Sequence, residues 1–151
     1  MLQIHQVQAF SDNYIWIISD GTSAWVVDPG DSVPVIAFLD RHRLSLSGIL
    51  LTHWHGDHAF GFPFLILDRK YITDTSADKI LALHHRPGGR EYLTSLSKLG
   101  FPGSLEDFLE SRIFWNNEES GILEGTEWSY ERFPVRHTPE TDPHGYELVH
   151  Q

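Results

Sequence analysis

The sequence predicts an α/β sandwich, and three observations favour that fold class. Ile4 to Phe10 and Tyr14 to Ser19 are rich in β-branched and aromatic residues and are separated by a Ser-Asp-Asn turn, which is typical of paired strands. A strand, a helix and a strand then follow one another between Ala24 and Thr52, and such a crossover packs helices against a sheet. With 151 residues, 40% of them hydrophobic, the chain is long enough for one domain with a core.

The crossover shows a local signal at each of its boundaries. Ala24 to Asp28 continues the sheet, and a Pro-Gly pair ends that strand. Asp31 or Ser32 can cap a helix whose apolar residues fall at helical spacing and which we expect to end near Arg43. The following strand, Gly48 to Thr52, is almost wholly apolar, as strands buried on both faces are.

The rest of the chain predicts shorter elements and completes one domain over residues 1–151, with no repeat or linker. We expect a helix over Asp57 to Leu67, polar turns over Asp68 to Asp78, a strand over Lys79 to His84, helices over Arg90 to Leu99 and Leu105 to Leu109, an acidic loop over Asn116 to Gly125, and strands over Trp128 to Arg136 and Tyr146 to Gln151. Six aromatic residues are interpreted as core: Phe10, Trp16, Trp25, Phe60, Phe62 and Phe64.

Metal-ligand side chains gather directly after the buried strand. Within six positions the chain places four of them: His53, His55, Asp57 and His58. Imidazole and carboxylate suit zinc, iron or manganese, and a loop that follows a buried strand presents them rigidly. Because of the spacing, His53 and His55 can reach one ion, while Asp57 and His58 can reach a second. The pattern therefore indicates metal-assisted hydrolysis.

A third imidazole can come from the later part of the chain. His137 follows Phe133-Pro-Val-Arg at the end of an expected strand, the same placement that His53 has, although it can also be read as a surface histidine. Three imidazoles would satisfy one tetrahedral zinc and leave its fourth position for water. Asp28, just before the Pro-Gly turn, is expected either to orient the metal-binding loop by accepting N–H groups or to cap a turn.

The other histidines receive different interpretations. His84 and His85 are adjacent, so in a strand they point to opposite faces, and we expect them to be surface residues. His144 lies in a Pro-rich turn and is a candidate for substrate binding. The remaining ones are expected to be solvated: His5, His42 and His150.

Composition narrows the classes of function. A formal net charge of −10 disfavours nucleic-acid binding, which needs clustered Lys and Arg, although bound metal ions would offset part of that charge. The absence of cysteine removes disulfides and thiolate metal ligands. No segment has the pattern of a secretory signal or the length of a membrane span, so a soluble cytoplasmic protein is expected.

The segment from Thr52 to His58, Thr-His-Trp-His-Gly-Asp-His, resembles the HxHxDH signature of the metallo-β-lactamase-fold hydrolases. Ala9 to Trp16 and Val26 to Asp31 precede it and look like the opening of glyoxalase II, the hydroxyacylglutathione hydrolase, over about the first sixty residues. His58 to Leu65 and Phe133 to Tyr146 look more like the ribonuclease Z-type branch. The resemblance implies an αββα sandwich, here truncated or incomplete at the C-terminus.

The resemblance also implies how the metals are held. The Thr-Pro-Gly-His-Thr motif of glyoxalase II is absent, so only the ribonuclease Z-like alignment makes His137 the third ligand. The bridging aspartate and the final histidine of the superfamily have no counterpart. The second site therefore keeps only Asp57 and His58, and we expect one Zn²⁺ bound firmly and a second weakly, with iron or manganese as alternatives.

Three functions stay open at this point. The leading one resembles glyoxalase II: a zinc-bound hydroxide hydrolyses a small-molecule thioester such as an S-acylglutathione, and Asp57 holds or accepts the proton of the water. The missing ligands of the second site are expected to weaken this activity. The second is a ribonuclease Z-like phosphodiesterase that uses two metals. The third is a half-domain that binds metal without turnover or that acts after pairing, since an exposed sheet edge at Tyr146 to Gln151 would favour self-association.

Overall fold

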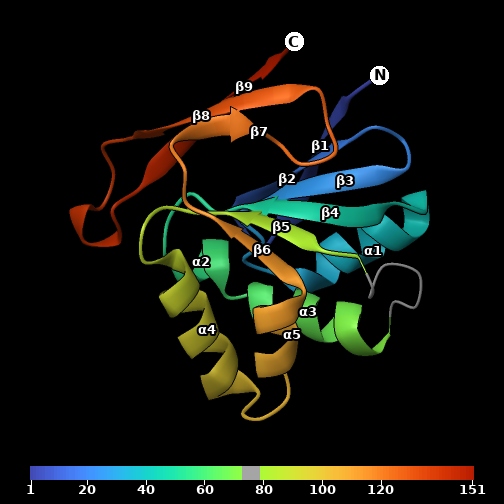
Figure 1. Ribbon diagram of the computed structural model, residues 1–151. Helices are drawn as coiled ribbons and strands as arrows, with labels where there is room; N and C mark the ends of the chain where they lie inside the picture. The colour runs from blue at the N-terminus through green and yellow to red at the C-terminus, as the bar shows by residue number, and fades with distance from the viewer. Residues whose placement is uncertain (73–78) are drawn as a thin grey trace.

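The computed structural model describes residues 1–72 and 79–151 and shows a six-stranded sheet between a layer of helices and a three-stranded sheet (Figure 1). The larger sheet contains, side by side, β1 (Gln3–Ala9), β2 (Asn13–Ser19), β3 (Ser23–Val27), β4 (Ser45–Leu50), β5 (Leu81–His84) and β6 (Ile113–Asn116). The smaller sheet contains β7 (Ser120–Ile122), β8 (Trp128–Pro134) and β9 (His144–His150). The helices are α1 (Ser32–His42), α2 (Gly56–Ala59), α3 (Phe62–Tyr71), α4 (Gly89–Gly100), α5 (Glu106–Ser111) and the short 3₁₀ helix η1 (Pro139–Thr141).

The direction of the strands decides where the loops meet. β1, β2 and β3 pair antiparallel, whereas β3, β4, β5 and β6 run parallel. The carboxyl ends of parallel strands share one edge of a sheet, so the segments that follow β3, β4 and β5 lie together. This edge is on the left of Figure 1, where α2 and the β8–β9 hairpin also lie.

The larger sheet is buried on both faces. Ile49 belongs to the core between this sheet and the helices, and its neighbour Leu50 belongs to the core between the two sheets. Successive strand residues point to opposite faces, so a strand covered on both sides is apolar throughout. The prediction of a buried strand after the first helix is confirmed.

The boundaries of α1 follow the sequence signals. The carboxylate of Asp31 caps the helix by accepting the Val33 N–H at 3.0 Å. Arg43 ends it in the left-handed conformation with φ 55°. An N-cap carboxylate and a left-handed C-terminal residue satisfy backbone groups that the helix leaves unpaired, so the expected start and end are both confirmed.

The single helix expected over 57–67 is wrong, because the chain forms α2 and α3 with a break between them. Pro63 lies in the first turn of α3, where its missing N–H has no partner to lose. A Cβ on Gly61 would lie 2.1 Å from the Pro29 carbonyl oxygen, so the break brings two backbone segments together. α3 continues to Tyr71, into the segment expected to form turns, and residues 73–78 lie outside the described residues.

Two strands were not predicted. β6 pairs with β5 although its four residues are too few for a clear periodic pattern. β7 lies inside the segment expected to be an acidic loop, and all three of its residues are exposed. Backbone pairing to β8 defines this strand, and an exposed strand leaves no hydrophobic alternation in the sequence.

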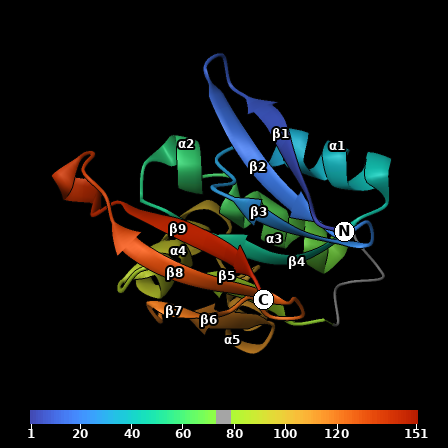
Figure 2. The same cartoon turned by 90° about the horizontal axis from the view of Figure 1, so that it is seen from above.

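The interpretation of the six aromatic residues as core is correct for Trp25 and Phe62, which are buried. It is wrong for the other four, whose side chains are about half exposed: Phe10, Trp16, Phe60 and Phe64. Trp16 lies on the face of β2 opposite to the buried Ile15 and Ile17, and Figure 2 shows the β1–β2 hairpin extending beyond the smaller sheet that would cover it. Among the described residues, none of the helices combines the length and the apolar character that crossing a membrane requires.

Candidate metal centre

Asp28 fixes the start of the loop that follows β4. Its two carboxylate oxygens accept the backbone N–H of Thr52 at 2.7 Å and the Thr52 hydroxyl at 2.6 Å. The hydroxyl oxygen of Thr52 in turn lies 2.9 Å from Nδ1 of His53. The expected role of Asp28 in orienting this loop is therefore visible as hydrogen bonds, and the ring of His53 is held through Thr52.

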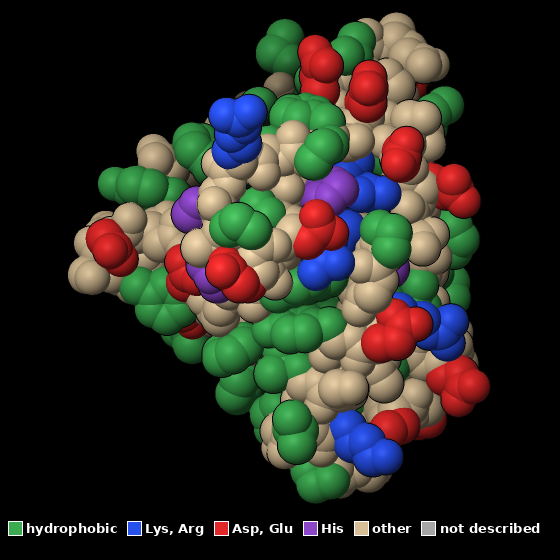
Figure 3. Space-filling model, turned by 90° about the vertical axis from the view of Figure 1, so that its left-hand side faces the viewer, with side chains coloured by type: hydrophobic (Ala, Val, Ile, Leu, Met, Phe, Trp, Pro, Cys, Tyr) green, Lys and Arg blue, Asp and Glu red, His purple; other side chains and the backbone are tan. Residues whose placement is uncertain are grey.

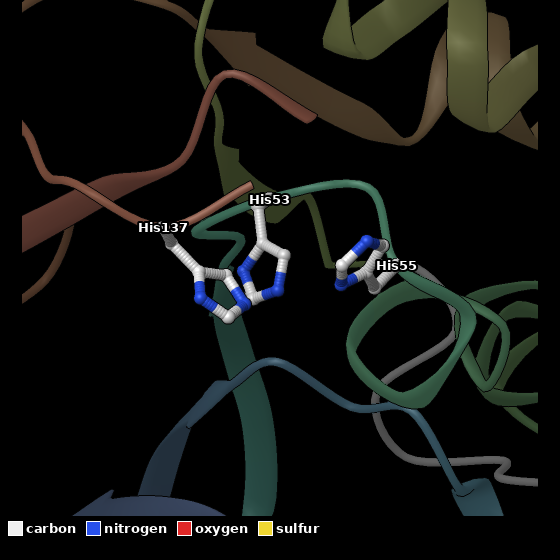
Figure 4. Close-up of side chains that lie close together, drawn as sticks. All are labelled: His53, His55 and His137. Atoms are coloured by element: carbon white, nitrogen blue, oxygen red, sulfur yellow. The ribbon is translucent and has the colours of Figure 1, made fainter. Parts of the chain in front are cut away.

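Three imidazoles come together at this edge of the larger sheet. Possible ligand nitrogens of His53, His55 and His137 all lie within 4.8 Å of one another, and Figure 4 shows His53 between the other two. His53 is only 6% exposed, and its Nε2 atom is buried with no hydrogen-bond partner among the described residues. A buried, partnerless nitrogen beside two further imidazoles fits a divalent metal ion, because three nitrogen donors and an open position are a typical zinc environment.

The electrostatic environment of His53 also favours metal binding. Burial, together with the neighbouring His58 ring, lowers the pKa of His53 to about 4. The imidazole is therefore neutral at pH 7, and a neutral imidazole is the form that binds a metal.

His58 joins a second group of potential ligands. Its Nδ1 lies 3.0 Å from the Asp28 carboxylate, and donor atoms of Asp28, His53 and His58 lie within 4.8 Å of one another. Burial opposes a charge on His58, but the hydrogen bond to Asp28 and its negative charge raise the pKa of His58. The carboxylate of Asp57 lies 3.3 Å from Nε2 of His58 and belongs to neither group of ligands. The structure thus places His58 beside His53 and leaves Asp57 next to this pair, where the Asn13 amide donates to its carboxylate at 3.2 Å.

The smaller sheet delivers His137 to the other two histidines. At the start of β9 the His144 N–H donates to the Thr52 carbonyl oxygen at 2.8 Å, which ties the β8–β9 hairpin to the metal-binding loop. The hydroxyl of Thr138 lies 3.5 Å from Nε2 of His55. The side chain of His144, the candidate for substrate binding, is instead held by Arg132, whose Nη1 lies 2.7 Å from its Nδ1.

A set of contacts around Trp54 was missed by the sequence reasoning. The guanidinium of Arg86 lies over the Trp54 ring at 4.3 Å, and Tyr92 donates its hydroxyl proton to the Trp54 carbonyl oxygen at 2.8 Å. Arg86 also pairs with Asp142, next to η1, at 3.1 Å. Trp54 lies between His53 and His55 in the chain, so these contacts hold the metal-binding loop from the side of α4. The residues are dispersed along the sequence, and no spacing signal relates them.

The expectation that His84 and His85 are surface residues is wrong. They do point to opposite sides, but both sides are covered, and the residues are 1% and 4% exposed. His84 lies between the sheets, with its Nε2 2.6 Å from the Glu124 carboxylate and its ring against Tyr130. His85 lies beside Gly89 of α4 and donates through Nδ1 to the Arg86 carbonyl oxygen at 2.7 Å. Burial lowers the pKa of both rings, although the contact with Glu124 opposes the shift at His84.

As expected, His42 and His150 are exposed, while His5 is half-buried and bonded to Ser19.

The model of the Metallo-beta-lactamase superfamily matches residues 9–148. The chain belongs to the metallo-beta-lactamase superfamily. Among curated relatives of this metallo-beta-lactamase chain, the hydroxyacylglutathione hydrolase of Hahella chejuensis is 42% identical over 115 residues, which cover 72% of this chain and 45% of that protein. The hydroxyacylglutathione hydrolase of Pseudoalteromonas translucida is 49% identical over 75 residues, 48% of this chain and 29% of that protein. The chain thus spans less than half the length of these relatives, and the similarity to the Hahella enzyme extends well past the sixty residues expected.

Solved structures show the same fold. Human tRNase Z, short form, superimposes with a TM-score of 0.62 at 17% identity, over 99% of this chain and 64% of that one. The BLEG-1 B3 metallo-beta-lactamase superimposes with a TM-score of 0.59 at 22% identity, over 97% of this chain and 66% of that one. The expected metallo-β-lactamase-type fold is confirmed.

Proposed function

We propose that this metallo-beta-lactamase superfamily chain is a metal-dependent hydrolase that splits thioesters of the S-acylglutathione kind into a thiol and an acid. The observation that carries the proposal is the convergence of His53, His55 and His137, with the buried Nε2 of His53 lacking any partner among the described residues. The identity to hydroxyacylglutathione hydrolases of Hahella chejuensis and Pseudoalteromonas translucida supports a thioester as the substrate.

His53, His55 and His137 would hold the metal ion, with zinc the natural choice for three imidazoles. When bound, the ion supplies positive charge that polarises a carbonyl oxygen and promotes the ionisation of water. Around it, Asp28 keeps the loop in place through Thr52 and orients His58. Asp57 Oδ2, beside His58 Nε2, would accept the proton of the attacking water. The water oxygen bonds to the carbonyl carbon, the carbon–sulfur bond breaks, and the sulfur leaves with its electron pair and takes up a proton.

The test is the hydrolysis of S-lactoylglutathione by zinc-loaded protein. The loss of thioester absorbance measures the rate. Replacing Asp57 by Asn should lower kcat on the order of a hundredfold or more, because a positioned base contributes about that much. Asp40→Asn, which changes an exposed carboxylate of α1 that belongs to neither group of ligands, is the control and should leave the rate within twofold. A folded, zinc-loaded protein that leaves the thioester intact would contradict the proposal.

Phosphodiester hydrolysis is the second candidate, and one observation favours it. The third imidazole, His137, lies three residues past the end of β8 and directly before Thr138-Pro-Glu-Thr, a placement that resembles the ribonuclease Z-type branch rather than glyoxalase II. Cleavage of bis(p-nitrophenyl) phosphate, rising with added manganese or a second equivalent of zinc, would identify this activity. Metal binding with turnover of neither substrate would instead identify a non-catalytic half-domain.

A further inference from the structure

An apolar groove adjoins the histidine cluster. It has a volume of about 620 Å³, and large hydrophobic side chains line it: Phe10, Val33, Phe60 and Phe64. These side chains are between 52% and 72% exposed, so the groove presents to solvent the kind of surface that a protein normally buries. Hydrophobic side chains border histidines on the face of the molecule shown in Figure 3.

The backbone is built to form this groove. A Cβ on Gly30 would lie 1.7 Å from the Asp57 carbonyl oxygen, and one on Gly61 would lie 2.1 Å from the Pro29 carbonyl oxygen. The segment after β3 therefore approaches α2 and the residues that follow it closely, without intervening side chains. Phe10 reaches its place with φ 55°, a backbone conformation that is unfavourable for a residue with a large side chain.

Asp57 connects the groove with the proposed site. It lines the groove, and its carboxylate lies 3.3 Å from Nε2 of His58, whose ring centroid is 3.8 Å from that of His53. A substrate whose carbonyl carbon lies at the imidazoles can therefore extend past Asp57 toward Phe60 and Phe64. Among the described residues, the carboxylates of Asp12, Asp31 and Asp57 line the groove, and the chain carries a net charge of −10. Negative charge of this kind disfavours an anionic occupant and favours a neutral, apolar one.

We propose that this groove binds the alkyl chain of the acyl group, so that medium-chain acyl thioesters are better substrates than short ones. The inference rests on the proposed function, thioester hydrolysis, and it specifies the class of acyl group that the substrate carries. Burial of apolar surface drives the preference, and each methylene group that leaves water should raise kcat/KM about fourfold until the groove is filled.

The kinetic test uses zinc-loaded protein and acetyl, butyryl, hexanoyl and octanoyl esters of one thiol. We expect kcat/KM to rise along the series, and we expect Phe60→Ala and Phe64→Ala each to reduce the octanoyl-to-acetyl ratio about tenfold or more. Phe114→Ala is the matched control, because Phe114 is a similarly exposed phenylalanine on β6 that does not line the groove. An unchanged ratio in both groove variants would overturn the inference.

A binding experiment separates the groove from the reaction. The neutral fluorophore N-phenyl-1-naphthylamine should bind metal-free protein, be displaced by octanol, and bind at least tenfold more weakly to Phe64→Ala but not to Phe114→Ala. If the fluorophore binds in this way and no thioester is hydrolysed, the proposed function fails while the apolar site stands. If thioesters are hydrolysed without a chain-length preference and the fluorophore does not bind, the groove inference fails alone. Sedimentation tests whether a second copy covers the groove instead. If the unaltered protein is dimeric and the Phe64→Ala variant is monomeric, a second copy occupies the groove, and the inference is overturned.

Discussion

His58 and Asp28 form a contact that holds the metal-binding loop in place: Nδ1 of the imidazole lies 3.0 Å from the carboxylate. The same carboxylate accepts the N–H of Thr52. One aspartate at the end of β3 therefore holds the loop near its beginning, at Thr52, and near its end, at His58. A carboxylate that orients an imidazole usually affects metal affinity without touching the metal.

Asp28→Asn should weaken zinc binding by about 10–100-fold, because the amide keeps the shape of the side chain but removes its charge. Calorimetric titration of metal-free protein with zinc measures this change. Asp20→Asn is the control, since Asp20 also accepts backbone N–H groups, those of Thr22 and Ser23, in a turn between β2 and β3. Equal losses in the two variants would contradict a specific role for Asp28.

Zinc titration of the unaltered chain should show one strong step and at most one weak step. His137→Ala should remove most of the strong binding, with a loss greater than the 10–100-fold expected for a residue outside the ligand set. His150→Ala, an exposed histidine at the end of β9, should leave the affinity unchanged. Two equally tight zinc ions per chain would show that ligands beyond these three histidines complete a second site.

Stability should fall in mild acid, and His84 should account for part of the change. Burial lowers the pKa of His84, so in the folded chain this ring takes up a proton at a lower pH than in the unfolded chain, where it does so near pH 6.5. Its contribution is therefore complete above pH 6.5 and is lost as the pH falls from there toward the lowered pKa. Urea denaturation at pH 7.5 and 5.5 should show a smaller pH effect for His84→Gln than for the unaltered chain. The exposed His42→Gln should keep the full effect, and identical pH effects in all three proteins would contradict the prediction.

Gly30→Ala should destabilise the fold by about 1–3 kcal/mol or more, because the new methyl group would lie 1.7 Å from the Asp57 carbonyl oxygen. The contact would also displace α2, so zinc affinity should fall together with stability. Gly100→Ala, at the end of α4, provides the comparison, since its methyl group meets no atom of the described residues within 4 Å. We expect that change to be neutral or to stabilise by up to about 1 kcal/mol. Urea midpoints measure both variants, and a Gly30→Ala protein as stable as Gly100→Ala would argue against the close approach.

β9 is an edge of the smaller sheet, and Val149 on it is 52% exposed. An open edge strand can pair with another chain, so we expect the sedimentation mass to rise with protein concentration. Val149→Lys should reduce that rise, because charge on an edge strand disfavours pairing. Thr126→Lys, in the turn before β8, should leave the rise in mass unchanged. A mass that stays constant with concentration would exclude association through this edge.

The sequence predicts best what local signals encode. The caps of α1, the apolar run of β4 and the cluster from His53 to His58 are each contained in a few consecutive residues. The placement of His137 after a strand was predicted by analogy with His53, and the structure places the two ring centroids 5.3 Å apart, although β8 ends at Pro134, two residues before the expected end. These features needed no knowledge of which segments lie side by side.

The remaining features depend on contacts between distant segments. His84 is buried because the smaller sheet, formed after residue 119, covers the face of β5 on which it lies. The same sheet does not reach Trp16, which stays exposed on β2 despite an apolar pattern. Periodicity gives the face of a strand to which a residue points, but only the tertiary arrangement determines whether that face is covered.

The hairpin that carries His137 has a consequence for how the chain folds. Thr138 and His55 lie 3.5 Å apart although 83 positions separate them in the sequence. An ion shared by His53 and His137 would cross-link two distant parts of the chain, and the conformational entropy lost in closing so long a loop would be offset by metal binding. The parallel unit of β3, β4 and β5 has its own core with the helices and does not need this link. Removing the ion should therefore loosen β8 and β9 first, with their amide hydrogens exchanging faster while those of β4 stay protected.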